Sequence, residues 1–249
     1  EGVYARDLIL SIIGMIGANG ANYMAMEFSG EGLKTLNISD RIAICNLCVE
    51  AGAKTALMEV DDITLDYLKA HSREPKHIFK SDEDAVFAKV YNIDLATIQP
   101  IVAKPHFVDN VVSAKECVGT HIDEAFLGSC NNGRIEDLRV GAELIKGKKV
   151  HPLVRFLVVP ASAAVYQQAL SEGIISTFMD AGAIVMNPNC SVCWGSCQGV
   201  IGENEVLIST GTRNFKGRAG HKDSFVYLAS AATVTASAIK GEIATADMV

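Results

Sequence analysis

The stretch DEAFLGSCNNGR, residues 123–134, joins a predicted β-strand to a cysteine in a glycine-flanked loop. Residues 123–127 are predicted to form the strand, and Cys130 lies in the loop directly after it. The residues from Glu136 to Ile145 predict a helix that ends at Gly147. A strand followed by a helix is the building unit of an α/β domain.

The same alternation continues to the end of the chain. Short apolar, β-rich runs predict further strands at 154–159, 183–186 and 206–209. Helices are expected at 162–170 and, as an Ala-rich closing helix, at 223–240. Strands that alternate with helices predict an α/β fold with a mostly parallel sheet.

The first half of the chain has a weaker but similar pattern. Helices are expected at 7–17, from a cap at Ser39-Asp40 through Val49, and at 62–70, with strands at 23–28 and 54–58. Residues 71–110 are charged and mixed, which favours a domain boundary near their end. We therefore predict two α/β domains with mostly parallel sheets, at 1–108 and 109–249.

Composition narrows the classes of function. The chain has 249 residues, of which 49% are hydrophobic and 20% charged, and its net charge is −7. The acidic balance and the lack of a basic run argue against nucleic-acid binding. No run of about 18 apolar residues predicts a membrane span. The odd number of cysteines, seven, with no secretory signal at the first residues, favours metal ligands or buried thiols in a reducing cytoplasm.

Three loops that follow predicted strands carry the reactive residues. One holds Cys130, the second holds Cys190 and Cys193 as a CxxC pair, and the third holds Arg213 and Arg218. Loops at the carboxyl ends of parallel strands converge in an open α/β sheet. Three thiolates can hold an iron–sulfur cluster with one iron open, and two guanidinium groups can hold a small polycarboxylate beside it.

Other interpretations of these residues stay open at this point. A CxxC pair by itself also occurs in redox pairs and as half of a zinc site. Cys197 could supply a fourth thiolate, which would give a closed iron–sulfur or zinc centre suited to electron transfer or structure. Cys45 and Cys48 lie in a predicted helix and favour a core position. The two arginines could instead pair with nearby acids.

The motifs resemble those of a known family. GSCNNGR at 128–134, the CxxC pair and TRNFKGR at 212–218 are similar to the large-subunit signatures of the aconitase superfamily, in particular 3-isopropylmalate dehydratase and archaeal-type homoaconitase. The likeness extends over the chain through further short segments. They are DLIL at 7–10, YMAMEF at 23–28, RIAICN at 41–46, EAGAK at 50–54 and KSDED at 80–84.

The resemblance implies a cofactor and roles for individual residues. It implies a 4Fe-4S cluster held by Cys130, Cys190 and Cys193, with one open iron that takes the substrate hydroxyl and a carboxylate. Arg213 and Arg218 would bind substrate carboxylates, and Glu27 would be a catalytic glutamate. Asn131, Asn132 and Asn214 could hydrogen-bond the cluster sulfides or neighbouring loops.

The resemblance also implies a function and partners. The expected activity is that of a hydro-lyase that dehydrates and rehydrates a hydroxy di- or tricarboxylic acid, first 3-isopropylmalate in leucine biosynthesis, with homoaconitate or dimethylmalate as alternatives. The family's large subunit carries a further N-terminal domain, and its small swivelling-domain subunit supplies a base. Because neither matches this chain, we expect the chain by itself to be inactive.

Overall fold

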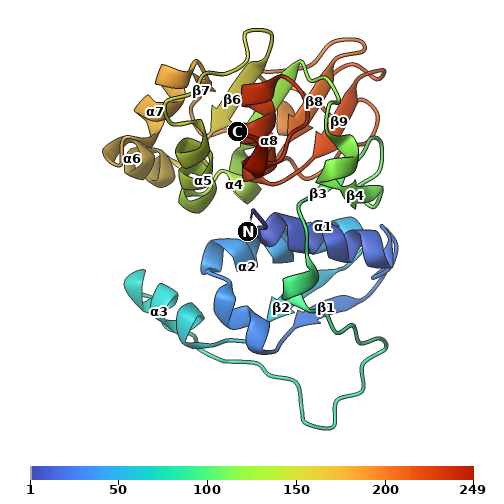
Figure 1. Cartoon of the computed structure of the whole chain (residues 1–249). Helices are drawn as coiled ribbons and strands as arrows, with labels where there is room; N and C mark the ends of the chain where they lie inside the picture. The colour runs from blue at the N-terminus through green and yellow to red at the C-terminus, as the bar shows by residue number, and fades with distance from the viewer. Residues whose placement is uncertain (1) are drawn as a thin grey trace.

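A seven-stranded sheet forms the centre of the structure, a computed structural model that describes residues 2–249 (Figure 1). Five neighbouring strands of this sheet are parallel, and two at one edge, β3 and β4, are antiparallel. Across the sheet the order is β4 (Val111–Ser113), β3 (Ile101–Ala103), β9 (Phe225–Leu228), β8 (Val206–Ser209), β5 (Glu124–Gly128), β6 (Arg155–Val159) and β7 (Ile184–Val185). The prediction of an α/β fold with mostly parallel strands is confirmed.

Helices cover both faces of this sheet (Figure 1). One layer consists of α5 (Ile135–Ile145), α6 (Ala163–Ser171), α7 (Ile174–Ala181) and α8 (Ala231–Lys240), and the other of α1 (Ala5–Ile16) and α2 (Ile38–Leu47). Successive residues of β5 alternate between the two apolar cores, with Leu127 in one and Phe126 in the other. That alternation follows from the period of two in a strand, so a sheet buried on both faces needs apolar residues throughout.

A second, two-stranded parallel sheet pairs β1 (Ala25–Phe28) with β2 (Thr55–Met58). It lies beside α2, with α3 (Asp62–Ala70) at its outer side (Figure 1). The remaining short helices are α4 (Ser129–Asn132), η1 (Glu31–Thr35), η2 (Cys48–Ala51), η3 (Leu95–Thr97), η4 (Ala114–Cys117), η5 (Ser191–Cys193) and η6 (Ala246–Met248). Because α1 packs against the large sheet and against α2, the N-terminal segment joins both sheets into one body. The division of the chain at residue 108 stays a prediction.

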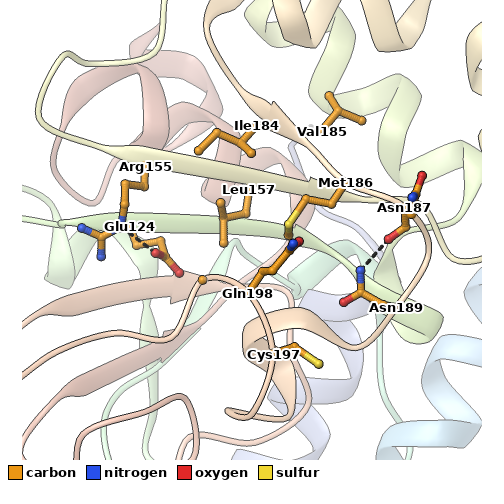
Figure 2. Close-up of a pocket in the computed structure, with 11 residues that line it drawn as sticks. Glu124, Arg155, Leu157, Ile184, Val185, Met186, Asn187, Asn189, Cys197 and Gln198 are labelled. Atoms are coloured by element: carbon orange, nitrogen blue, oxygen red, sulfur yellow. Dashed lines mark hydrogen bonds and ion pairs between the residues drawn. The ribbon is translucent and has the colours of Figure 1, made fainter.

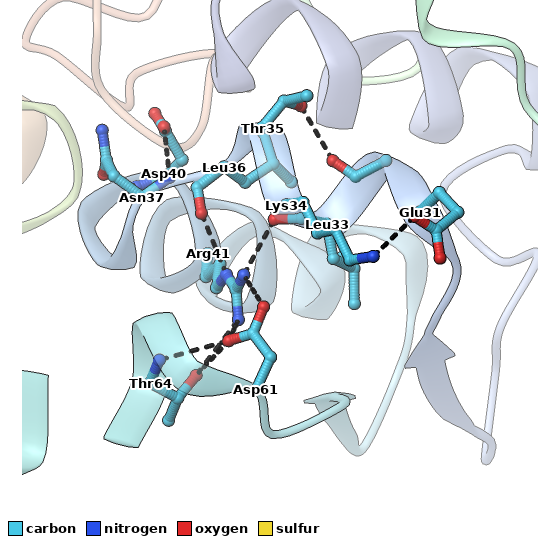
Figure 3. Close-up of polar contacts among 11 residues, drawn as sticks. Glu31, Leu33, Lys34, Thr35, Leu36, Asn37, Asp40, Arg41, Asp61 and Thr64 are labelled. Carbon is cyan, nitrogen blue, oxygen red and sulfur yellow. Dashed lines mark hydrogen bonds and ion pairs between the residues drawn. The ribbon is translucent and has the colours of Figure 1, made fainter. Parts of the chain in front are cut away.

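The buried guanidinium of Arg41 holds the small sheet and its helices together (Figure 3). Its Nη1 and Nη2 donate to the two carboxylate oxygens of Asp61 at 2.7 and 2.6 Å. The remaining donors go to Thr64 Oγ1 and to the carbonyls of Leu33 and Leu36, at 3.1, 2.8 and 3.1 Å. Hydrogen bonds from this guanidinium lower the pKa of Asp61 to about 2. All five N–H donors of the fork are therefore used.

Several element predictions were wrong in detail. The segment 223–240 is not one helix, because its first part, Phe-Val-Tyr-Leu, forms strand β9 and only the Ala-rich part forms α8. Aromatic and β-branched residues favour the strand. Helix α2 is capped by Asn37 rather than by Ser39 or Asp40: the Asn37 side chain accepts from the Asp40 amide at 2.9 Å. Helix α7 and strand β3 were not predicted. Within residues 2–249 no helix is long and apolar enough to span a membrane.

Candidate metal centre

The strand order places two of the predicted loops side by side. From β5 the parallel strands continue to β6 and β7 on one side, and β8 and β9 follow on the other. The direction of winding therefore changes between β5 and β8, and ligands in such sheets bind beyond the carboxyl ends of the strands at this point. Cys130 follows β5, and the loop of Arg213 and Arg218 follows β8. The two strand ends are joined by Thr210, whose hydroxyl accepts from the Gly128 amide at 2.9 Å.

Close backbone packing fixes the loop of Cys130. A Cβ on Gly128 or on Gly133 would overlap the carbonyl oxygen of Val159 on strand β6. The Gly133 carbonyl also accepts from the Ala161 amide at 2.8 Å, so the loop is held against the end of β6. Ser129, directly before the cysteine, has a left-handed backbone with φ 66°. Cys130 itself is exposed.

The second cysteine loop follows β7 and is held by a buried serine. Ser191, between Cys190 and Cys193, also has a left-handed backbone, with φ 44°. Its hydroxyl donates to the Gln198 carbonyl at 2.8 Å, and its amide donates to Asn189 Oδ1 at 2.5 Å. Left-handed residues other than glycine cluster at functional sites, where the surrounding structure holds them.

Cysteines of both loops act electrostatically on the Cys190 thiol. Burial raises the pKa of Cys190, and the negative charges of Cys193, Cys130 and Cys197 raise it further, while Arg218 lowers it. Such effects weaken with distance, and the geometry places Cys193 beside the loop after β8: a Cβ on Gly211 would lie 3.5 Å from Cys193 Sγ. All seven cysteines are free. Within residues 2–249 no three His, Cys, Asp or Glu side chains are grouped around a position for a single metal ion.

The donor set fits an iron–sulfur cluster by its chemistry. Soft thiolates are the usual ligands of such clusters. Cys130, Cys190 and Cys193 are the thiols that the sequence predicted for this role, and Cys197 lies near enough to act electrostatically on Cys190. Which of these thiols bind iron stays a prediction.

The two predicted arginines lie in different surroundings. The Nε of Arg213 donates to Glu50 Oε1 at 2.7 Å, with 40% of the arginine side chain and 12% of the glutamate side chain exposed. No hydrogen bond within residues 2–249 uses its two terminal nitrogens, which stay available to a carboxylate. Arg218 stacks on Phe215 at 5.6 Å and acts on the Cys190 thiol. Its buried Nε has no hydrogen-bond partner among the described residues.

Glu27 lies on strand β1, on the small sheet. Its side chain is exposed and accepts a hydrogen bond from the Ser81 hydroxyl at 2.7 Å. The observed contact is thus with the segment after α3. Its catalytic role stays a prediction. By contrast, Cys48 is buried and donates to the Ile44 carbonyl at 3.3 Å, and burial raises its pKa to about 12. It is a core thiol.

A polar network that the sequence analysis missed lies behind the cysteine loops. Arg6, only 1% exposed, donates to Asn132 Oδ1 at 3.0 Å and to the carbonyls of Thr210, at 2.9 Å, and Gly211. Asn132 donates in turn to Asp137 at 3.1 Å, and burial raises the pKa of Asp137 to about 6. No local pattern marks Arg6 in the sequence, since a charged residue in a first helical turn is usually on the surface.

The three asparagines hydrogen-bond helix α2, one another and backbone carbonyls of a neighbouring segment. Asn131 accepts from Asn46 on α2 at 2.9 Å and donates to Asn132 at 2.9 Å. Asn214 is buried and donates to the carbonyls of Lys104 at 2.8 Å and Phe107 at 3.3 Å. Its Oδ1 is buried without a partner in residues 2–249. These amides hold the site loops to the rest of the fold.

A cavity of about 960 Å³ lies beside the second cysteine loop (Figure 2). Glu124 and Arg155 lie at one end of it and Asn187 and Asn189 at the other, with Cys197 on the side of the loop (Figure 2). Cys130, Cys190 and Cys193 are not among its lining residues. The cavity thus adjoins the second cysteine loop through Cys197.

Comparison with known proteins identifies the family. A sequence profile of the aconitase family (aconitate hydratase) matches residues 1–241. The chain belongs to the aconitase family. The cysteine loops and the switch point of the sheet described above are thus those of an aconitase-family chain, and the resemblance inferred from the sequence motifs is confirmed.

Individual relatives give the same family and two specific names. A probable 3-isopropylmalate dehydratase large subunit from Methanothermobacter thermautotrophicus is 50% identical over 98% of this chain and 58% of its own length. A 3-isopropylmalate dehydratase large subunit from Caldicellulosiruptor saccharolyticus is 48% identical over 96% of this chain and 56% of its own. A probable methanogen homoaconitase large subunit from M. thermautotrophicus is 49% identical over 97% of this chain and 56% of its own length. The chain thus spans a little over half the length of these relatives.

Proposed function

We propose that this chain is part of the large subunit of an iron–sulfur hydro-lyase. Its substrate would be a hydroxy di- or tricarboxylic acid, first 3-isopropylmalate in leucine biosynthesis, with homoaconitate or a dimethylmalate as alternatives. One observation carries the proposal: the loops of Cys130, Cys193 and the two arginines meet at the carboxyl edge of the parallel sheet, where the Gly128 amide donates to Thr210 and a Cβ on Gly211 would lie 3.5 Å from Cys193 Sγ. The names of the relatives, which include both a 3-isopropylmalate dehydratase and a homoaconitase, support the substrate class.

In this proposal the cysteines bind the cluster and the arginines orient the substrate. Cys130, Cys190 and Cys193 would hold a 4Fe-4S cluster. A cluster with three protein ligands supplies an open, Lewis-acidic iron toward a hydroxyl or a carboxylate. Arg213, anchored through its Nε by Glu50, would present its terminal nitrogens to a substrate carboxylate in the two-point manner of a guanidinium.

Proton transfer would need groups from outside the described site. Glu27 would handle a proton near the substrate, although its present partner is Ser81. We propose that the substrate base comes from a small-subunit partner, as the term large subunit in the relatives' names suggests. In this proposal the part of the large subunit that lies outside the matched region of the relatives would complete the pocket, in a cytoplasmic enzyme.

Anaerobic reconstitution of the chain with iron and sulfide, followed by Mössbauer spectroscopy, tests the proposal. One iron with parameters distinct from the rest, which shift on addition of 3-isopropylmalate, is the expected result. Succinate, which lacks the hydroxyl, is the matched control acid. Four equivalent irons that do not respond to the hydroxy acid, or no cluster at all, would refute an open site.

A closed centre is the second candidate, because Cys197 acts electrostatically on the Cys190 thiol. In that case the chain would serve electron transfer or structure. Cys197→Ser discriminates between the two: cluster loss after reconstitution favours a closed centre with four cysteines. A retained cluster with an acid-responsive iron favours the hydro-lyase. Cys117→Ser is the control, since Cys117 is buried in the core away from these loops.

A further inference from the structure

Arg6 is a buried cation whose hydrogen bonds go to neutral groups. It lies in the first turn of α1 and is 1% exposed. Its terminal nitrogens donate to the Asn132 side chain and to the carbonyls of Thr210 and Gly211. Its Nε is buried and has no partner in residues 2–249. Among the ion pairs of these residues, none includes Arg6.

The neighbouring acid, Asp7, does not pair with it. The two carboxylate oxygens of Asp7 accept from the amides of Tyr4 and Ile101, each at 2.9 Å. Burial raises the pKa of Asp7 to about 7, so its charge is weak near neutral pH. Buried charges in proteins are nearly always paired with an opposite charge. The other acids that act on Arg6 are Asp137, which is bonded to Asn132, and Glu50, and neither forms an ion pair with it in the described part of the chain.

Of the charges that act on Arg6, that of Cys193 has the largest effect, ahead of Asp137, Asp7 and Glu50. Arg6 donates to the carbonyl of Gly211. A Cβ atom added to this glycine would lie 3.5 Å from Cys193 Sγ. Arg6 and Cys193 thus lie on either side of one glycine. Burial lowers the pKa of Arg6 to about 10, and the Cys193 charge is first among the groups that raise it. Arg6 is therefore cationic at neutral pH.

The contacts of Arg6 also join the site loops. Asn132 is on the loop of Cys130, after β5, whereas Thr210 and Gly211 begin the loop of Arg213, after β8. One rigid guanidinium therefore connects the ends of β5 and β8, between which the winding of the sheet changes direction. The arginine fork suits this task because its donors are fixed in one plane.

We propose that Arg6 is a positioning residue of the metal site, which balances the charge of the ligating thiolates and clamps the loop of Cys130 to the loop after β8. This inference rests on the proposed function, because the charge that it balances belongs to the bound cluster. Charge near an iron–sulfur cluster sets its reduction potential and its affinity for the protein. A positive charge favours the reduced, more negative state.

Reduction potentials test the charge. Arg6→Gln removes the charge and keeps a donor, and Arg6→Lys keeps the charge. Arg139→Gln is the control, because it removes a cation of α5 that is half-exposed and paired with Glu172 at the end of α6. After reconstitution, redox titration followed by electron paramagnetic resonance should show a more negative potential for Arg6→Gln. Arg6→Lys and Arg139→Gln should stay near the unsubstituted chain. Equal potentials for all four chains, or equal shifts for both Arg6 variants, would overturn the charge role.

Hydrogen exchange of the iron-free chain tests the clamp. Arg6→Lys cannot reach all three acceptors at once, so the amides of residues 129–133 and 210–212 should exchange several-fold faster than in the unsubstituted chain. Unchanged exchange would overturn the clamp. If Arg6→Gln is unfolded without iron while Arg6→Lys folds, the charge serves the polypeptide itself, which also overturns the charge role. Failure of the unsubstituted chain to take up a cluster would instead refute the proposed function.

Discussion

Substitution of Gly133 by alanine should loosen the metal site through one added methyl group. Gly133 has φ −113°, which any residue can adopt, so alanine brings no backbone strain of its own. A Cβ at this position would overlap the Val159 carbonyl and lie 2.7 and 2.9 Å from the oxygen and nitrogen of Ser129. All of these atoms belong to the backbone, which cannot move aside as a flexible side chain can.

The expected cost follows from this overlap. Overpacking of a close contact costs about 1–3 kcal/mol, and the loss of glycine flexibility in the unfolded chain returns about 0.4–1 kcal/mol. We therefore expect Gly133→Ala to lower the free energy of unfolding by roughly 1–2 kcal/mol. Because the Gly133 carbonyl accepts from Ala161 and its amide donates to Ser129, relief of the overlap must displace the turn that carries Cys130. The bound iron after reconstitution should fall as well.

Urea unfolding of the iron-free chain measures the stability, and iron and sulfide analysis after reconstitution measures the site. Gly202→Ala is the matched control, since the atom nearest to its added methyl is Glu205 Oε2 at 3.6 Å, an ordinary contact. It should change stability by less than about 0.5 kcal/mol and leave the iron content unchanged. If Gly133→Ala behaves like Gly202→Ala in both assays, the close approach to β6 does not fix the cysteine loop.

Three further outcomes are expected. Arg41→Met should lower the free energy of unfolding in urea by about 3 kcal/mol, because it leaves buried carbonyls and a carboxylate unpaired. The control Lys34→Met removes one partner of an exposed ion pair and should lower it by less than about 1 kcal/mol. Burial raises the pKa of Glu124 to about 7 from 4.5, so its contribution to stability is complete below pH 4.5 and is lost as pH rises to 7. Glu124→Gln should reduce the slope of the free energy of unfolding with pH in that window. A slope equal to that of the unsubstituted chain would contradict this. Glu50→Gln should weaken binding of a hydroxy acid to the reconstituted chain several-fold by freeing Arg213; tighter binding would show that Glu50 competes with the acid.

Much of the fold was predictable because its signals are local. The strand at 206–209 and the helix at 62–70 were predicted with the bounds observed. Apolar periodicity and caps reside in neighbouring residues, so they are visible without a structure. Predictions failed where packing decided the outcome. Residues 225–228 form a strand because they complete the sheet between β8 and β3, although an Ala-rich helix follows them directly.

The sequence by itself determined the chemistry of the chain: which loops carry thiols and guanidinium groups, and that these loops follow strands of an α/β sheet. Only the tertiary structure decided which of these groups meet. The winding of the sheet reverses between β5 and β8, which brings the Cys130 loop against the loop after β8. The burial of Arg6 behind both loops, and the pairing of Arg213 with Glu50, join residues 126 to 205 positions apart. Contacts at such separations depend on the packing of the whole chain, and no local pattern of residues specifies them.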